Sequence, residues 1–235
     1  SGSMKGRFIE KALKTLQFLL LSLPKTCLFN VISIGHKNFK NLFEKSRECT
    51  NENIAVAIKE VQKITAKGGT HIYEALEWVL KYSLSDMPTS VFLFSDFETS
   101  NIGIVKLIKD YQEKKEKKNN LRIFSIGMND SISHHFIESM VRAGNGYAEY
   151  VSNSEQMNRK AMIMLRNSLN PTKDYDEIIW TDKEPQNSSI KFQQVPLKIP
   201  ELYVGVRFII YCILPKDVKP CKQITIKSKS QDILS

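Results

Sequence analysis

The stretch Val91-Phe92-Leu93-Phe94-Ser95-Asp96 is a continuous apolar run that ends in two polar residues. Such a run predicts a strand buried on both faces, as in a parallel sheet covered by helices. Asp96 would then lie at the carboxyl end of the strand, where open α/β sheets bind their ligands. We therefore expect Asp96 to be functional, although a carboxylate at a strand end can also simply accept backbone N–H bonds.

Helical and strand patterns alternate on both sides of this run as far as residue 170. A helical period of apolar residues indicates helices in residues 8–23, 54–64, 72–80, 104–111, 136–141 and 157–165. Short apolar runs indicate strands in residues 28–34, 121–126 and 147–151. Asn51 or Asn53 is placed to cap the second helix with its side-chain oxygen. Because such alternation is typical of βαβ units, we predict an α/β fold with a doubly wound, mostly parallel sheet.

The order of the elements departs from a complete sheet in one respect. The pattern begins with a helix, whereas a doubly wound sheet begins with a strand. We expect that first strand, which would be central in the sheet, to lie upstream of Ser1. Its two neighbours would lack a shared partner, and unpaired buried backbone groups are costly, so the isolated chain is expected to be poorly stable.

Beyond residue 170 the helical period disappears. Strand patterns occupy residues 177–181, 203–214 and 223–227, and prolines punctuate them at positions 185, 196, 200, 215 and 220. We predict an α/β domain in residues 1–170 and a small β-rich extension, itself truncated, in residues 171–235.

Composition and charge weigh against several classes of function. The 235 residues carry 34 basic and 25 acidic side chains, a net charge of +9. The dense basic run at residues 114–118 has no interleaved aromatic residues of the kind that stack on single-stranded nucleic acid. Nucleic-acid binding driven by the net positive charge therefore remains an alternative function, but the sequence has no motif that would recognise bases. No apolar run approaches the ~20 residues of a membrane-spanning helix.

The four cysteines, at positions 27, 49, 212 and 221, form no C-x-x-C pair, so a zinc site is not indicated. They are typical of reduced, partly buried thiols, although Cys212 and Cys221 could bridge across a hairpin in an oxidising compartment. We expect a cytoplasmic protein, with an extracellular one as the alternative if the full-length protein carries a signal peptide.

Four side chains with oxygen atoms form a candidate metal site. Ser1 and Ser3 stand just before the first helix, Thr70 follows two glycines before the third, and Asp96 follows the strand at residues 91–94. Oxygen ligands suit a hard divalent cation such as Mg²⁺, Mn²⁺ or Ca²⁺. Two simpler interpretations stay open, because serine and glycine also serve as linkers and Thr70 could be an ordinary helix cap.

The segments Ser1-Gly2-Ser3-Met4-Lys5-Gly6, Gly68-Gly69-Thr70 and Ser95-Asp96 with Glu98 occur in the order and spacing of a von Willebrand factor A domain. Residues 29–35, 122–127, 142–150 and 199–205 support the same resemblance. The chain most resembles the A domains that follow a vault protein inter-α-trypsin domain. These occur in inter-α-trypsin inhibitor heavy chains, in vault poly(ADP-ribose) polymerase and in intracellular proteins that contain a von Willebrand factor A domain.

The resemblance implies a module that binds another protein through a metal-ion-dependent adhesion site. Ser1, Ser3 and Thr70 would hold a magnesium-like ion, Asp96 would act directly or through water, and a carboxylate of the partner would complete the shell. Two departures stand out: the aspartate expected two residues before Ser1 lies outside this sequence, and Phe97 replaces the usual glycine. We therefore expect this chain to bind a divalent cation weakly or not at all.

No enzymatic motif accompanies these residues. The chain has no G-x-G-x-x-G after a strand and no G-x-S-x-G elbow, and His134, His135 and Glu138 match no helical metalloprotease spacing. We expect no catalytic activity and no small-molecule substrate. The alternative is that the chain is one part of a larger enzyme, as the likeness to the vault polymerase would allow.

Overall fold

The fold was analysed in a computed structural model of the chain. It describes residues 6–35, 39–66, 71–82, 87–95, 102–114, 121–128, 133–151, 155–170, 175–180, 193–214, 224–228 and 233–234. The chain divides into two compact units, Ser1–Ser168 and Leu169–Ser235.

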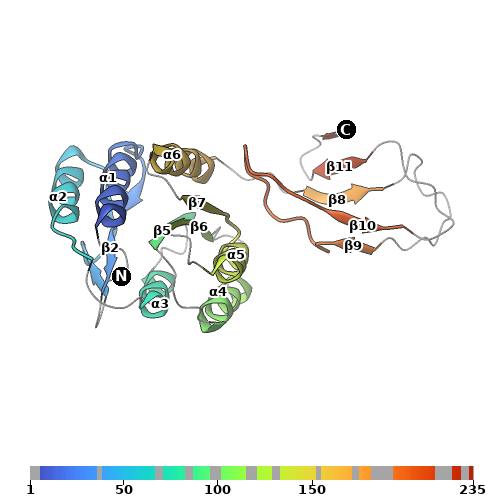
Figure 1. Ribbon diagram of the computed structural model, residues 1–235, viewed down its shortest axis with the longest axis horizontal. Coiled ribbons are helices and arrows are strands. Elements are labelled where there is room, and N and C mark those ends of the chain that lie inside the picture. Colours follow the sequence, from blue (N-terminus) through green and yellow to red (C-terminus); the bar gives the residue numbers. More distant parts are fainter. Residues whose placement is uncertain are drawn as a thin grey trace. The chain divides into compact units, whose positions relative to one another are not determined.

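The first unit is built on a parallel sheet in the order β5-β6-β7 (Figure 1). Its strands are β5 (Thr89–Ser95), β6 (Leu121–Met128) and β7 (Ala148–Val151). Thr89 pairs with Leu121 at one end of the β5–β6 ladder and Ser95 with Gly127 at the other. All eight residues of β6 are buried, as expected for a strand covered on both faces. The predicted α/β class with a parallel sheet is confirmed.

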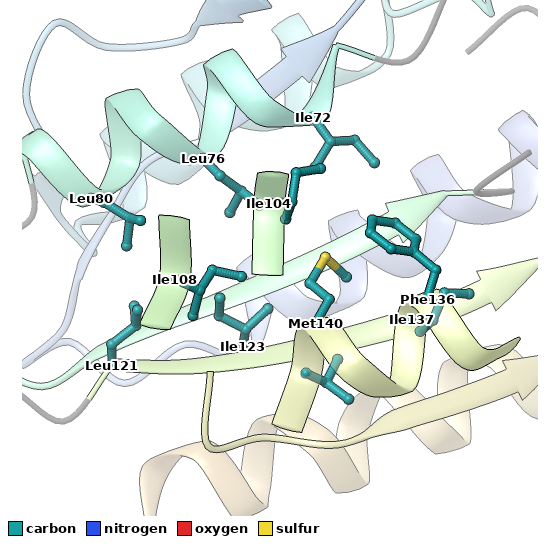
Figure 2. Packing of buried hydrophobic residues seen from close by; sticks show 11 residues of the cluster. Ile72, Leu76, Leu80, Ile104, Ile108, Leu121, Ile123, Phe136, Ile137 and Met140 are labelled. Atoms are coloured by element: carbon teal, nitrogen blue, oxygen red, sulfur yellow. The ribbon is translucent and has the colours of Figure 1, made fainter. Parts of the chain in front are cut away.

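Three helices cover one face of this sheet: α3 (Ile72–Tyr82), α4 (Ile102–Lys114) and α5 (His134–Ala143). Figure 2 shows their apolar side chains meeting over β6, where Leu76, Ile108, Ile123, Ile137 and Met140 are at most 1% exposed. Each helix supplies residues spaced three or four apart, so the face that packs is the one the helical period predicts.

On the opposite side of β6 and β7 lies α6 (Glu155–Leu169) (Figure 1). Its apolar stripe, Met157, Ala161, Met164 and Leu165, is buried. The first helix, α1 (Arg7–Leu21), is linked to α6 by a hydrogen bond from the Thr15 hydroxyl to Asn158 Oδ1.

A second apolar cluster lies between α1 and α2 (Asn51–Val61), which pack on each other. Four short strands follow α1 in the chain: β1 (Leu28–Phe29), β2 (Ile32–Ile34), β3 (Phe39–Asn41) and β4 (Arg47–Glu48). Phe29 of β1 belongs to the cluster, as do Val31, Phe43 and Cys49 from the segments next to these strands. The pairs β1–β4 and β2–β3 are both antiparallel.

The strand predicted in residues 28–34 is therefore two strands. The break falls at Asn30, whose side-chain oxygen accepts the N–H of Val31 (2.8 Å) and of Phe43 (3.1 Å), while its Nδ2 donates to the carbonyl of Phe43 (2.9 Å). Because the carboxamide takes the backbone partners that a ladder would use, the strand is interrupted there.

Helix α2 begins earlier than predicted. Its N-cap is Thr50, whose hydroxyl accepts the N–H of Asn53 (3.2 Å). The prediction of Asn51 or Asn53 as the cap was wrong: Asn51 is already helical, and Asn53 Nδ2 donates instead to the carbonyl of Glu48 (3.0 Å).

The described residues form no ladder between β2 and β5. Both strands nevertheless contribute to the cluster under α3, since Ile34 of β2 and Val91 and Leu93 of β5 pack against it. Phe39 of β3 also contacts Trp78 of α3, with ring centroids 6.1 Å apart. Thus α3 covers two sheet pieces that are not hydrogen-bonded to each other. The strand predicted upstream of Ser1 remains a prediction.

Among its described residues beyond α6, the second unit has strands and connecting segments but no helix. The strands β8 (Tyr175–Ile179), β11 (Thr225–Ser228) and β12 (Ile233–Leu234) form an antiparallel sheet in the order β12-β11-β8. β9 (Gln193–Val195) pairs antiparallel with β10 (Tyr211–Ile213).

The strand predicted in residues 203–214 is too long. Only Tyr211–Ile213 is extended into a ladder. Near its start the chain turns, since Gly205 has φ +80° and the N–H of Val206 donates to the carbonyl of Tyr203 (3.1 Å). Glycine takes this left-handed conformation without a Cβ penalty, so the turn replaces the first part of the predicted strand.

Candidate functional site

The carboxyl edge of the parallel sheet is the candidate site. The strands β5, β6 and β7 end there at Ser95, Met128 and Val151. Figure 2 shows Leu121 at the start of β6 and Ile72 towards the arrowheads, which puts the start of α3 at the carboxyl edge. Helix N-termini at such an edge present unpaired N–H groups, which is why ligands of α/β sheets bind there.

All four predicted metal ligands, Ser1, Ser3, Thr70 and Asp96, lie outside the described residues, as does Phe97. In the sequence, Asp96 directly follows the last residue of β5, and Thr70 is two residues before the start of α3. The metal site stays a prediction.

Among the described residues, no three His, Cys, Asp or Glu side chains are grouped so that they could hold a metal ion. Ser95, the described residue next to Asp96, is buried.

A polar cluster joins α5 to β7 near the same edge. The Tyr150 hydroxyl donates to Glu138 Oε1 (3.1 Å), and Arg142 Nε lies 3.8 Å from Glu138 Oε2. The ring of His134 lies 4.2 Å from that of Tyr150, centroid to centroid. Burial raises the pKa of Tyr150, and the Glu138 carboxylate raises it further.

Two of the three residues singled out in the sequence, His134 and Glu138, lie in this cluster. Both carboxylate oxygens of Glu138 already have a partner on the protein, and His134 packs on an aromatic ring. The arrangement fastens α5 to β7. The Glu138–Arg142 spacing is readable from the sequence as an i, i+4 pair, whereas the contact with Tyr150 comes from the packing of two elements.

A second polar network lies on the α6 side of the sheet. Asn167 Nδ2 donates to the Tyr147 hydroxyl (2.9 Å), and Lys160 donates to the carbonyl of Tyr150 (2.8 Å) while pairing with Glu149 (2.9 Å). Burial raises the pKa of Tyr147 to about 12, against the opposing effect of the Asn167 hydrogen bond. The phenol is therefore neutral at physiological pH and serves to position α6.

None of the helices in the described part of the chain is both long and apolar enough to cross a membrane.

Comparison with known proteins identifies the domain family to which this fold corresponds. The family model described as von Willebrand factor type A domain matches residues 1–150. Two von Willebrand factor A domain-containing proteins of Dictyostelium discoideum are each 32% identical, over 93% and 96% of this chain and 10% and 23% of their own length. Von Willebrand factor A domain-containing protein 5A of Rattus norvegicus is 31% identical over 88% of this chain and 24% of its own.

Solved structures agree on the fold. A von Willebrand factor type A structure from Catenulispora acidiphila matches with a TM-score of 0.65 at 15% identity, over 86% of this chain and 48% of that one. The chain spans about a tenth to a quarter of the length of the curated relatives it matches.

Proposed function

Since the chain belongs to the von Willebrand factor type A domain family, a family of protein-interaction modules, we propose that it binds a partner protein at the carboxyl edge of β5, β6 and β7. The site is a docking surface and not a catalytic centre. A divalent cation, Mg²⁺ or Mn²⁺, takes part where the ligand set is complete.

The observation that carries this proposal is the position of Asp96 in the chain. It follows β5 directly, on a strand whose carboxyl end shares an edge with those of β6 and β7. Thr70 precedes α3, the helix that packs over the same strands. A carboxylate and a hydroxyl oxygen brought together at that edge would suit a hard cation.

The residues of this chain would act as follows. Ser1, Ser3 and Thr70 supply neutral hydroxyl oxygens, and Asp96 supplies a carboxylate, directly or through water. Neutral ligands leave much of the cation's positive charge uncompensated, so a carboxylate from the partner completes the shell. The bound cation would supply only this electrostatic link.

Two residues limit the strength of the site in this chain. The positive end of a helix dipole disfavours a cation beside a helix N-terminus. The ligand set in this chain has only one carboxylate, that of Asp96, to offset this effect. Phe97 places a bulky side chain next to Asp96 where glycine would leave the backbone free. The 235-residue chain therefore binds Mg²⁺ or Mn²⁺ weakly or not at all, and docking rests largely on the protein surface.

Titration calorimetry with MgCl₂ and with MnCl₂ tests the cation. Little or no heat is expected for the chain as given, and Asp96→Ala should not change the result. Tight one-to-one binding that Asp96→Ala abolishes would overturn the expectation of a weak site.

Capture of partners on the full-length protein tests the docking edge. Asp96→Ala should weaken the retention of a bound partner. The matched control is Glu113→Ala, because Glu113 is exposed in the last turn of α4, whereas the site is expected where the helices begin. If EDTA and Asp96→Ala both leave the retained proteins unchanged, the metal-mediated form of the proposal fails. If Asp96→Ala and Glu113→Ala act alike, the edge is not the site.

A further inference from the structure

Two cysteines face each other at the end of the β1–β4 ladder. Cys27 immediately precedes β1 and Cys49 immediately follows β4. Leu28 pairs with Glu48 in the antiparallel register, so Cys27 and Cys49 are the next opposed residues. The N–H of Cys49 donates to the carbonyl of Cys27 (3.1 Å), which continues the ladder by one bond.

Both side chains point to the same side. Cys49 is a buried member of the apolar cluster between α1 and α2, and Cys27 packs against that cluster. Opposed residues of an antiparallel pair have Cα atoms about 4.5–5.5 Å apart, within the range of about 4.4–6.8 Å that a disulfide spans. Both thiols are free, so the pair is reduced but has the backbone placement of a disulfide.

The two thiols differ in access. Cys49 is 2% exposed, whereas Cys27 is half-buried and open to small molecules. Burial raises the pKa of the Cys49 thiol, and the neighbouring Cys27 raises it further. Cys27, the more accessible of the two, is thus the thiol that a dissolved disulfide meets first, and the buried Cys49 is held beside it.

We propose that Cys27 and Cys49 are a reversible oxidation site that closes to an intramolecular disulfide by exchange with a small disulfide such as oxidised glutathione. The Cys27 thiolate attacks one sulfur of oxidised glutathione, its S–S bond breaks, and the glutathione thiolate leaves and takes up a proton. Cys49 then loses its proton and attacks the Cys27 sulfur of the mixed disulfide, releasing the second glutathione. Two cysteine thiols are oxidised, and one oxidised glutathione is reduced to two thiols.

Closure would secure the segment that contains β2 and β3. These strands lie between the two cysteines in the chain, and they touch α3 through Ile34 and through the Phe39–Trp78 ring contact. A loop of this length restricts the unfolded chain enough to stabilise the fold. The expected effect is a rise of roughly 5–10 °C in the Tm of the first unit. The inference does not depend on the proposed docking function.

Peptide mapping identifies the pairing directly. The full chain is equilibrated in buffers of increasing oxidised-to-reduced glutathione ratio, trapped with iodoacetamide and cleaved with trypsin. Cleavage after Lys25, Lys37, Arg47 and Lys59 places Cys27 in peptide 26–37 and Cys49 in peptide 48–59. The expected product joins these two peptides and is lighter than their summed mass by two hydrogen atoms.

The pairing that the sequence suggests gives a different product. A Cys212–Cys221 bridge would join peptides 208–216 and 217–222. Recovery of peptides 26–37 and 48–59 in singly alkylated form at every ratio, or linked only to other cysteines, overturns the proposal.

Variants separate the disulfide from general effects of oxidation. Cys27→Ser should remove both the linked peptide and the oxidation-dependent rise in Tm, while Cys212→Ser should keep both. A rise in Tm that persists in Cys27→Ser would refute stabilisation by the proposed Cys27–Cys49 disulfide. If the buried Cys49→Ala fails to fold, the wild-type peptide map and the half-buried Cys27→Ser variant still decide the question.

Discussion

The turn between α5 and β7 gives the sharpest test of the packing. Gly146 lies against the backbone of β6: a Cβ at this position would stand 2.0 Å from the carbonyl oxygen of Ile123 and 2.7 Å from its carbonyl carbon. The Gly146 N–H also donates to the carbonyl of Val141 (2.8 Å). A real Cβ essentially never approaches another atom closer than 3.0 Å, so Gly146→Ala must push the turn off the strand by about an ångström.

The loss of stability depends on which part of the structure must move to make room for the Cβ. Overpacking a core typically costs about 1–3 kcal/mol, and the obstacle here is strand backbone that is tied into ladders on both sides. Displacing the turn also weakens the bond to Val141, a loss of about 1 kcal/mol. We expect Gly146→Ala to lower the free energy of unfolding by about 2–4 kcal/mol, which corresponds to a fall in Tm of roughly 4–16 °C.

Thermal and urea unfolding followed by far-UV circular dichroism measures this change, because α1 to α6 all begin in the first unit. Gly144→Ala is the graded comparison: its Cβ would meet the Ile123 side chain, at 2.5 Å from Cγ1, and a side chain yields more easily than a strand. Gly205→Ala separates the two possible causes: its Cβ would have open space, so any loss of stability there comes from the left-handed backbone (φ +80°) alone, and it lies in the second unit. An effect of Gly146→Ala no larger than that of Gly144→Ala would refute the reasoning.

Three further outcomes are expected. Met140→Ala, at a position with 0% exposure under α3 and α4, should cost about 2–5 kcal/mol in urea unfolding, whereas the exposed Phe18→Ala should cost far less; equal losses would contradict the assigned core. The pKa of Tyr147 is raised in the folded state to about 12 from 10.0; the folded chain thus keeps this proton longer, and stability should fall as pH rises from about 10 to about 12. Tyr147→Phe should remove part of that slope, and an unchanged slope would count against the burial of the phenol. Binding to duplex DNA, followed by fluorescence anisotropy, should be weak and fall steeply with salt; salt-insensitive binding would favour a nucleic-acid function.

The predicted helices correspond to observed ones because their signal is local. In α5, Phe136, Ile137, Met140 and Val141 are all buried, and a helix whose apolar residues recur every three to four positions has one face to bury. The strand β6 was equally readable, since a continuous apolar run fits a strand covered on both sides. For the candidate site, the sequence predicted which polar residues follow the strands or precede the helices, but not how close they lie to one another.

Several features depend on partners far apart in sequence. Asn30 interrupts the predicted strand because its carboxamide bonds Phe43, thirteen residues away. Tyr150 reaches Glu138 only because β7 packs beside α5. No periodic pattern encodes such contacts, since each depends on how two elements are brought together.

The sequence by itself determined the α/β class, the faces that the helices bury and the residue types at the strand ends, because these follow from hydrophobic periodicity and side-chain chemistry. Only the tertiary structure decided that Cys27 lies opposite Cys49 and that Gly146 must lack a side chain. Strand register and close contacts between two backbone segments are set by long-range packing. The order of residues along the chain does not show how near two distant segments lie to each other.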